Sequence, residues 1–349
     1  PCSASHAICS VCSTASPAPG GGGATSRSMP RKREPVSRCW TRPPPAYLTS
    51  PPDDSATPGA RVIHWVPLTL LCALSLAAAD AVTKRWLSGL AARDITVVRF
   101  SLGGLVVLPI LLANPPDWPD CEFWGWILWL IPMELGALLL YVQAIRDHPL
   151  SLTLPYLAFT PAFVTLTGWF ILGEKVSLAG LTGIVLVVTG SWLLHAEKWT
   201  LSGLGRAIAA PLHHPGSRKM LAVAFLYALT SVGGKGALQY MPAAQFGPVY
   251  ILLVGAGAMV LFRGWERLPR VLHARSGAAI AAAALMGLMI LTHFMALQQV
   301  ETAYMIAMKR TSLVFGIIFG AIWFHETQLS RKLLAAAVML TGVGIISFS

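Results

Sequence analysis

Long runs of apolar residues, separated by short polar segments, occupy almost all of the chain after Val66. Each run approaches the roughly 20 apolar residues that an α-helix needs to cross the hydrocarbon core of a bilayer. Helices are required because backbone polar groups in lipid must be satisfied within the segment. The pattern predicts an all-α polytopic membrane protein with ten transmembrane helices, at residues 66–87, 95–113, 123–145, 150–172, 177–195, 219–240, 243–262, 277–297, 301–324 and 331–348.

Composition narrows the class of protein. Of 349 residues, 55% are hydrophobic and only 12% are charged, which is not the composition of a soluble domain. The net charge of +11 does not indicate nucleic-acid binding, since no soluble module is left to carry it. The H-E-x-x-H, G-x-S-x-G and P-loop motifs are absent from the sequence. We therefore expect no enzyme activity, cofactor or metal site, and transport driven by an ion or substrate gradient.

Residues 1–60 differ in kind from the rest of the chain. They are rich in Pro, Gly, Ser and Arg, and such a segment cannot bury enough apolar surface to fold. The first methionine is Met29. We expect 1–60 to be a disordered tail or an over-extended reading of the gene.

The second half of the chain repeats the layout of the first. Residues 141–196 align without a gap on 293–348, and a repeat of five helices must be inverted because an odd number of spans reverses the second copy. We expect a first repeat at 61–195, a loop at 196–218 and a second repeat at 219–349. The identical pairs are Ala144/Ala296, Phe163/Phe315, Gly168/Gly320, Glu174/Glu326, Leu181/Leu333, Thr189/Thr341 and Gly190/Gly342.

Residues 155–194 contain helix prolines, then L-G-E, then a Gly-rich helix that ends in T-G. This segment resembles the EamA module of the drug/metabolite transporter superfamily, and residues 303–347 resemble a second module. The second copy departs from the pattern with His325 in place of Gly and without a proline. The resemblance implies a ten-helix transporter of small metabolites, with family positions at Pro155, Pro161, Glu174 and Glu326.

Charged residues within apolar spans are functional candidates because burying them in a bilayer is costly. Asp80 and Lys84 lie on one face of the first helix, where they either pair or line a wet cavity. Lys235, Lys309 and Arg310 either line a substrate path or extend to the membrane interface.

Other polar residues have two interpretations each. Glu134 is a proton-coupling site or a partner for a lysine, and His293 is a titrating or a structural histidine. Glu174 and Glu326 are family-motif residues or surface acids that precede a helix. Tyrosine combines an apolar ring with a hydroxyl donor, which suits a pocket for a small solute. Three tyrosines are therefore further substrate-path candidates: Tyr141, Tyr156 and Tyr304.

Together these features predict a secondary transporter that works by alternating access, and the resemblance to the EamA family implies export. The excess of embedded cations favours an anionic or carboxylate-bearing metabolite, such as an amino acid or organic acid. A lipid-modifying membrane enzyme and a non-transporting scaffold are the alternatives. The expected partners are a small solute and the lipid bilayer, without nucleic acid, and the expected location is the bacterial inner membrane. Lys and Arg number fourteen in the loops after odd-numbered helices, against Lys175 alone after even ones, which predicts that both termini lie outside.

Overall fold

The computed structural model describes residues 58–116, 119, 121–148, 154–195, 214–324 and 329–349. Within these ranges all regular structure is helical. Seven stretches are long and apolar enough to cross a membrane: Trp65–Trp86, Ala92–Ala113, Cys121–Ala144, Pro215–Ala237, Ala243–Leu261, Gly264–Leu297 and Thr302–Trp323. Three further apolar helices are shorter, at Tyr156–Leu172, Leu178–Leu194 and Lys332–Ser347.

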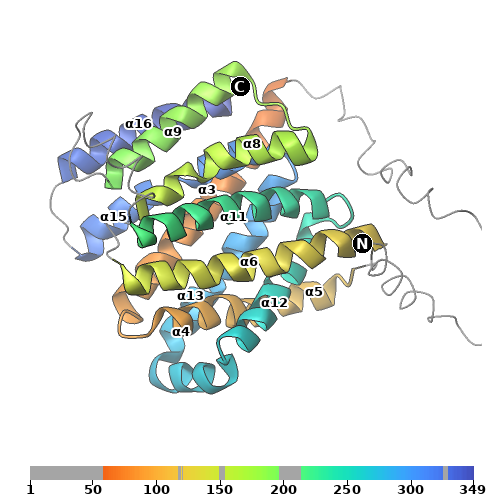
Figure 1. Cartoon of the computed structure of the whole chain (residues 1–349), viewed down its shortest axis with the longest axis vertical. Coiled ribbons are helices and arrows are strands. Elements are labelled where there is room, and N and C mark those ends of the chain that lie inside the picture. Colours follow the sequence, from red (N-terminus) through yellow and green to blue (C-terminus); the bar gives the residue numbers. More distant parts are fainter. Residues whose placement is uncertain (1–57, 117–118, 120, 149–153, 196–213, 325–328) are drawn as a thin grey trace, which may run out of the picture.

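The helices form a closely packed bundle (Figure 1). In chain order they are α3 (Pro58–Trp86), α4 (Ala92–Val97), the π-helix η2 (Val98–Leu102), α5 (Gly103–Ala113), α6 (Cys121–Asp147), the 3-10 helix η3 (Leu154–Phe159), α8 (Thr160–Leu172), α9 (Leu178–His195), α11 (Pro215–Ala237), α12 (Ala243–Leu261), α13 (Gly264–Leu297), α14 (Thr302–Lys309), α15 (Ser312–Phe324) and α16 (Leu329–Ser347).

Helix boundaries follow local backbone chemistry. Gly173 adopts a left-handed conformation, with φ of 68°, and ends α8 as glycine commonly does. Pro215 stands in the first turn of α11, where its missing N–H costs nothing. Within α13, Arg275 has non-helical angles (φ −149°, ψ 48°). This kink divides α13 into a short first segment, which follows α12, and the longer apolar segment after Arg275.

Several apolar helices are interrupted. The stretch Ala92–Ala113 passes from α4 through η2 to α5, and the shorter apolar helix Tyr156–Leu172 passes from η3 to α8. The stretch Thr302–Trp323 divides into α14 and α15 around Arg310 and Thr311. α8 begins at Thr160 and α15 begins at Ser312, which is 152 residues later and equals the offset that aligns the two halves of the sequence. The two helix breaks therefore occupy corresponding positions of the repeat.

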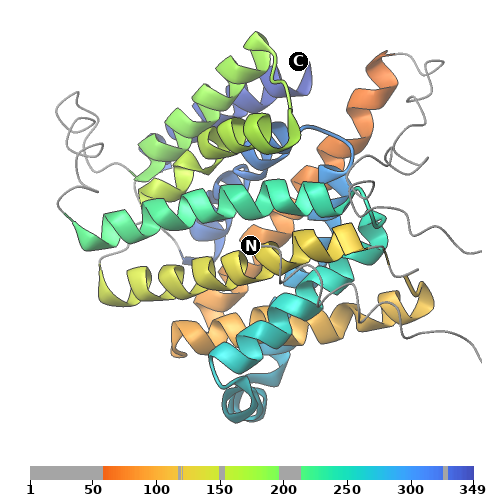
Figure 2. The same ribbon diagram turned by 45° about the vertical axis from the view of Figure 1, so that its right-hand side comes forward.

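The two halves interlock. α3 packs most extensively on α13, α6 on α11, and α9 on α16. Figures 1 and 2 both show α6 and α11 side by side along much of their length. Each of these pairs joins a helix of the first half to one of the second, so the core belongs to both halves.

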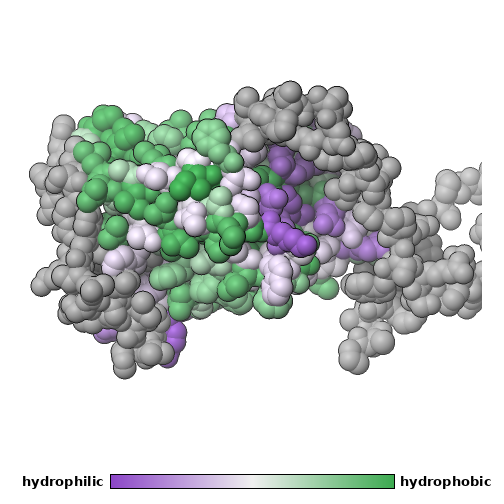
Figure 3. All heavy atoms as spheres, turned by 90° about the horizontal axis from the view of Figure 1, so that it is seen from above, coloured by the Kyte–Doolittle hydropathy of each residue, from purple (hydrophilic) through white to green (hydrophobic). Residues whose placement is uncertain are grey.

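The face that carries α9 and α16 is mostly apolar. Viewed from the side of α9 and α16, the molecule is covered largely by hydrophobic residues (Figure 3). Leu178 and Val185 of α9 and Leu333 of α16 are among the exposed side chains. A hydrophilic patch borders this apolar surface toward one edge of the same view (Figure 3). An extended apolar surface of this kind is unfavourable in water and matches contact with lipid.

Glycines allow α9 and α16 to approach each other closely. A Cβ at residue 183 would lie 2.8 Å from the carbonyl oxygen of Gly342, and one at residue 190 would lie 2.8 Å from that of Ala335. Small residues at such crossings are the usual basis of helix association in membranes.

Candidate functional site

A group of polar side chains meets in the middle of the bundle. Glu134 of α6 is 8% exposed, and the hydroxyl groups of Thr230 of α11 and Tyr250 of α12 lie close to its carboxyl group. Lys309, at the end of α14, places Nζ 3.4 Å from Nδ1 of His293 in α13 and interacts electrostatically with Glu134. We call these five residues the central cluster. They come from five different helices and both halves of the chain.

A second set of charges adjoins the central cluster. Arg99 of η2 forms an ion pair with Asp80 of α3, with 2.7 Å between Nη2 and Oδ1. Tyr141 interacts electrostatically with both partners. Tyr227 lies near enough to Arg99, Arg310 and Glu134 to interact electrostatically with each of them. Asp80 is 60% exposed and Arg99 only 16%, which places this pair at the outer edge of the polar region.

The three cations near the central cluster lie in or beside segments where the regular α-helix is interrupted. Arg99 is carried by a π-helix, a rare element that often marks functional sites. Lys309 ends α14, and Arg310 lies in the break before α15. Nε of Arg99, Nε of Arg310 and Oγ1 of Thr311 are buried without a hydrogen-bond partner. Since most buried polar groups are paired, these three atoms are exceptions among the described residues.

The central cluster is closed in this conformation. Glu134, Thr230, Tyr250 and His293 are all buried. One hollow, of about 330 Å³, lies between α3 and α15, lined by Arg85, Trp86, Ile322 and Trp323. Another, of about 480 Å³, is lined by Pro67, Leu68, Leu71 and Gln299. Neither is lined by the central cluster.

Lys235 has a structural role that differs from the expected one. Its Nζ donates to the carbonyl oxygens of Leu297 and Val300, each at 2.6 Å. α13 ends at Leu297, and the last carbonyl groups of a helix lack partners within it. Lys235 therefore caps the end of α13.

Two tyrosine candidates also lie away from the central cluster. Tyr304 Oη accepts a hydrogen bond from the Ser177 N–H at 2.9 Å, in the turn before α9. Tyr156 packs in a small apolar group with Ala144, Met220 and Val223.

The remaining candidates lie at helix ends. Lys84 is exposed in the last turn of α3. Pro161 stands in the first turn of α8, where it starts the helix after η3 instead of kinking it. Pro155 belongs to η3. Glu326 lies outside the described residues.

Glu174 is neither a surface acid nor part of the central cluster. Its carboxylate accepts hydrogen bonds from the N–H and the hydroxyl of Thr302, the first residue of α14. It therefore caps a helix that is distant in sequence, which the pattern of residues around it did not indicate.

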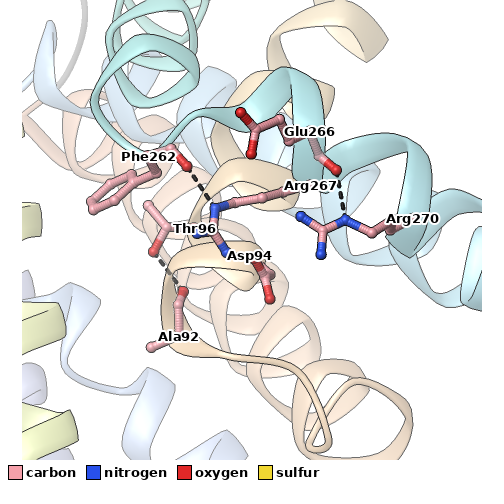
Figure 4. A network of polar contacts seen from close by, with 7 residues as sticks. All are labelled: Ala92, Asp94, Thr96, Phe262, Glu266, Arg267 and Arg270. Atoms are coloured by element: carbon pink, nitrogen blue, oxygen red, sulfur yellow. Dashed lines mark hydrogen bonds and ion pairs between the residues drawn. The ribbon is translucent and has the colours of Figure 1, made fainter.

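A third polar network holds one end of the bundle together (Figure 4). Arg267, near the start of α13, donates to the Phe262 carbonyl at 2.6 Å and to Asp94 of α4 at 2.6 Å. Arg270 donates to the Glu266 carbonyl at 2.7 Å. The network ties the ends of α4, α12 and α13 together.

Sequence reasoning missed Arg99, Tyr227, Thr230 and Tyr250. Arg99 lies within the predicted span 95–113, so the rule that a charge within a span is functional would have found it. The hydroxyl groups gave no such signal, because Thr and Tyr are common in spans. The described residues contain no group of three or more His, Cys, Asp or Glu that would hold a metal ion.

The sequence pattern of the EamA-like transporter family matches residues 63–196 and 215–348. The chain belongs to this family. It is an integral membrane protein of the drug/metabolite transporter superfamily, whose EamA members are transporters and not enzymes. The two matched segments are the two halves that the sequence repeat indicates, and the resemblance noted from the sequence is confirmed.

Two individual comparisons add detail. Over 71 residues the chain is 31% identical to the probable 4-amino-4-deoxy-L-arabinose-phosphoundecaprenol flippase subunit ArnE of Enterobacter sp. (strain 638). That match covers 20% of this chain and 66% of the relative, just under two thirds of its length. A protein of known crystal structure matches with a TM-score of 0.62 at 15% identity, over 83% of this chain and 97% of its own. That likeness shows a shared fold.

Proposed function

We propose that this EamA-family protein is a secondary transporter with ten membrane-spanning helices in two inverted five-helix repeats, working by alternating access. The breaks at Thr160 and Ser312 support the repeat, because they lie 152 residues apart. The helix contacts support it too. Exchanging the halves turns the α3–α13 pair into the α11–α6 pair and leaves the α9–α16 pair unchanged. Broken helices at the repeat interface are typical of transport sites near the bilayer midplane.

The proposed substrate is a small polar solute with a carboxylate or another anionic group. Arg99, Lys309 and Arg310 provide three cations around the cluster, against the acids Asp80 and Glu134. Both buried arginine Nε atoms lack a partner, which leaves donors for an anionic group. This is the single observation that carries the substrate class. Lys235 and Arg85 do not add to it, because they donate to backbone carbonyls.

Coupling to protons is proposed at Glu134 and His293, since both adjoin Lys309. A substrate carboxylate that binds Lys309 would compete with Glu134 for the ammonium group. Protonation of Glu134 would release Lys309 for the substrate. Export, across a bacterial inner membrane, is the proposed direction.

Transport by proteoliposomes tests the proposal. The protein is reconstituted and screened for uptake or exchange of labelled amino acids and organic acids. Lys309→Ala is expected to abolish transport with normal yield, whereas Lys219→Ala is the matched control. Lys219 is a partly exposed lysine in a 3.8 Å ion pair with Asp147, outside the cluster.

Two outcomes would overturn the proposal. Transport by Lys309→Ala at the unmutated rate would remove Lys309 from the mechanism. Movement of none of the solutes by the unmutated protein would favour the scaffold or lipid-enzyme alternatives. A further variant, Glu134→Gln, should retain exchange but lose accumulation against a gradient, and unchanged accumulation would exclude Glu134 from coupling.

A further inference from the structure

The turn between α8 and α9 binds the start of α14. Both Glu174 carboxylate oxygens accept the Thr302 N–H, at 3.1 and 3.0 Å, and Oε1 also accepts the Thr302 hydroxyl at 2.9 Å. Free N–H groups and the positive end of the dipole make a helix N-terminus a favourable place for a carboxylate. Thr302 is fully buried, so water does not replace this cap while the contact holds.

A second contact lies beside the first. Tyr304 Oη accepts the Ser177 N–H at 2.9 Å and lies 3.2 Å from Ser177 Oγ. We call Glu174, Ser177, Thr302 and Tyr304 the latch. These bonds span 127 and 128 residues of sequence and join the first half of the chain to the second.

Glycines make room for the latch. A Cβ at residue 168 would lie 2.8 Å from Glu174 Oε2, and one at residue 180 would collide with the Tyr304 ring. Any side chain at either position would displace a latch residue. The latch is thus sensitive to small changes in helices α8 and α9.

The latch and the central cluster lie at opposite ends of one short helix. α14 runs from Thr302 to Lys309, about 12 Å for eight residues. Arg310 and Thr311 then break the helix, and the buried Thr311 hydroxyl has no partner. α14 is therefore a short helix whose first residue is held by the latch and whose last residue is followed by a break in the helix.

We propose that the latch is a gate. On this proposal, which rests on the proposed transport function, the Glu174–Thr302 contact keeps α14 packed over the central cluster. Its release lets α14 pivot at Arg310 and Thr311 and opens a path to Lys309 from the face that carries the α8–α9 turn. Glu174 is then a residue that positions α14 and does not touch the substrate.

The native Cys72 reports on this opening. It is fully buried in α3, with Thr292 as its hydrogen-bond partner and Lys309 near enough to interact. The tail cysteines Cys2, Cys9, Cys12 and Cys39 and the exposed Cys121 are replaced by serine, which leaves one thiol. The full chain is reconstituted, and its reaction with a membrane-impermeant cationic methanethiosulfonate is timed from each face separately.

Glu174→Gln is expected to speed the reaction of Cys72 about fivefold from the latch face, the effect of losing roughly one net hydrogen bond. The rate from the other face should not change. Gly168→Ala should have the same effect by displacing the carboxylate, and it should add little to Glu174→Gln. Tyr304→Phe should give a smaller increase, since it removes only the second contact.

Gly190→Ala is the matched control for general loosening. It places a Cβ 2.5 Å from Met339 Cγ and 2.8 Å from the Ala335 carbonyl oxygen, a more severe clash than that at residue 168, in the α9–α16 contact away from the latch. It should lower the melting temperature and leave the Cys72 rate unchanged. Equal rates in the unmutated and latch variants would overturn the proposal. So would equal acceleration by Gly190→Ala, or acceleration from both faces.

The thiol readout needs no substrate, so the two proposals fail separately. Faster reaction of Cys72 without transport of any tested solute would keep the gate and refute the transport proposal. Transport that depends on Lys309, with an unchanged Cys72 rate in every latch variant, would refute the gate alone.

Discussion

Replacing Lys235 tests whether this lysine stabilises the fold or takes part in transport. Lys235→Met keeps the length of the side chain but removes the ammonium group that caps Leu297 and Val300. Both hydrogen bonds are 2.6 Å long and involve a charged donor. The variant leaves two carbonyl groups at the end of α13 without this partner.

The magnitude follows from those two bonds. Hydrogen bonds to charged groups contribute about 1.5–3 kcal/mol each, and the variant is spared the cost of burying a charge. We expect a net loss of about 2–4 kcal/mol in the free energy of unfolding. For a chain of this size that corresponds to a fall of about 4–8 °C in melting temperature.

Thermal unfolding of the detergent-solubilised protein measures this change. Lys219→Met is the control, since the partly exposed ion pair of Lys219 with Asp147 should contribute less than about 1 kcal/mol. Folded Lys235→Met should transport the same solutes as the unmutated protein. If instead it lost transport while its melting temperature was unchanged, Lys235 would belong to the substrate path and the capping role would be refuted.

Three further predictions concern other parts of the molecule. Asp80→Asn should slow transport without loss of yield, because Arg99 loses the 2.7 Å ion pair that anchors it; an unchanged rate in proteoliposomes would contradict this. Gly183→Val should lower the melting temperature strongly, whereas Gly344→Ala should be tolerated because nothing lies within 4 Å of a Cβ there. A C-terminal reporter that fluoresces only in the cytoplasm should be dark if the loop charges set the orientation, and bright cells would refute that.

The helical framework was predictable because apolar runs and polar joints map directly onto spans in a membrane. The expected span 243–262 is observed as Ala243–Leu261, and 95–113 as Ala92–Ala113. The interruptions were not predictable. The VRFSL segment that forms η2 contains no Gly or Pro, and the span 301–324 was expected to be continuous. Such breaks depend on which neighbouring groups replace the lost backbone bonds, and those neighbours are distant in sequence.

The site was predictable only in part. Lys309, His293 and Glu134 were candidates because charge and titratable groups are rare in spans, and the structure brings them together. Lys235 satisfied the same rule but caps a helix. A lysine side chain is long enough to reach either a central cavity or the end of a neighbouring helix. Only the register between α11 and α13 decides between them, and one sequence does not contain that register.

The cations at helix ends have a consequence for membrane insertion. Arg85 donates to the Trp323 carbonyl, Arg267 to that of Phe262 and Arg275 to that of Trp86. The same three residues are among the fourteen loop charges from which the sequence predicts the orientation of the chain in the bilayer. Moving them to the opposite loops would therefore change two properties at once: the signal that selects an orientation and the bonds that hold three helix ends. We infer that this chain cannot easily be redesigned or evolve to insert the other way around, since each relocated charge would also destabilise the folded bundle.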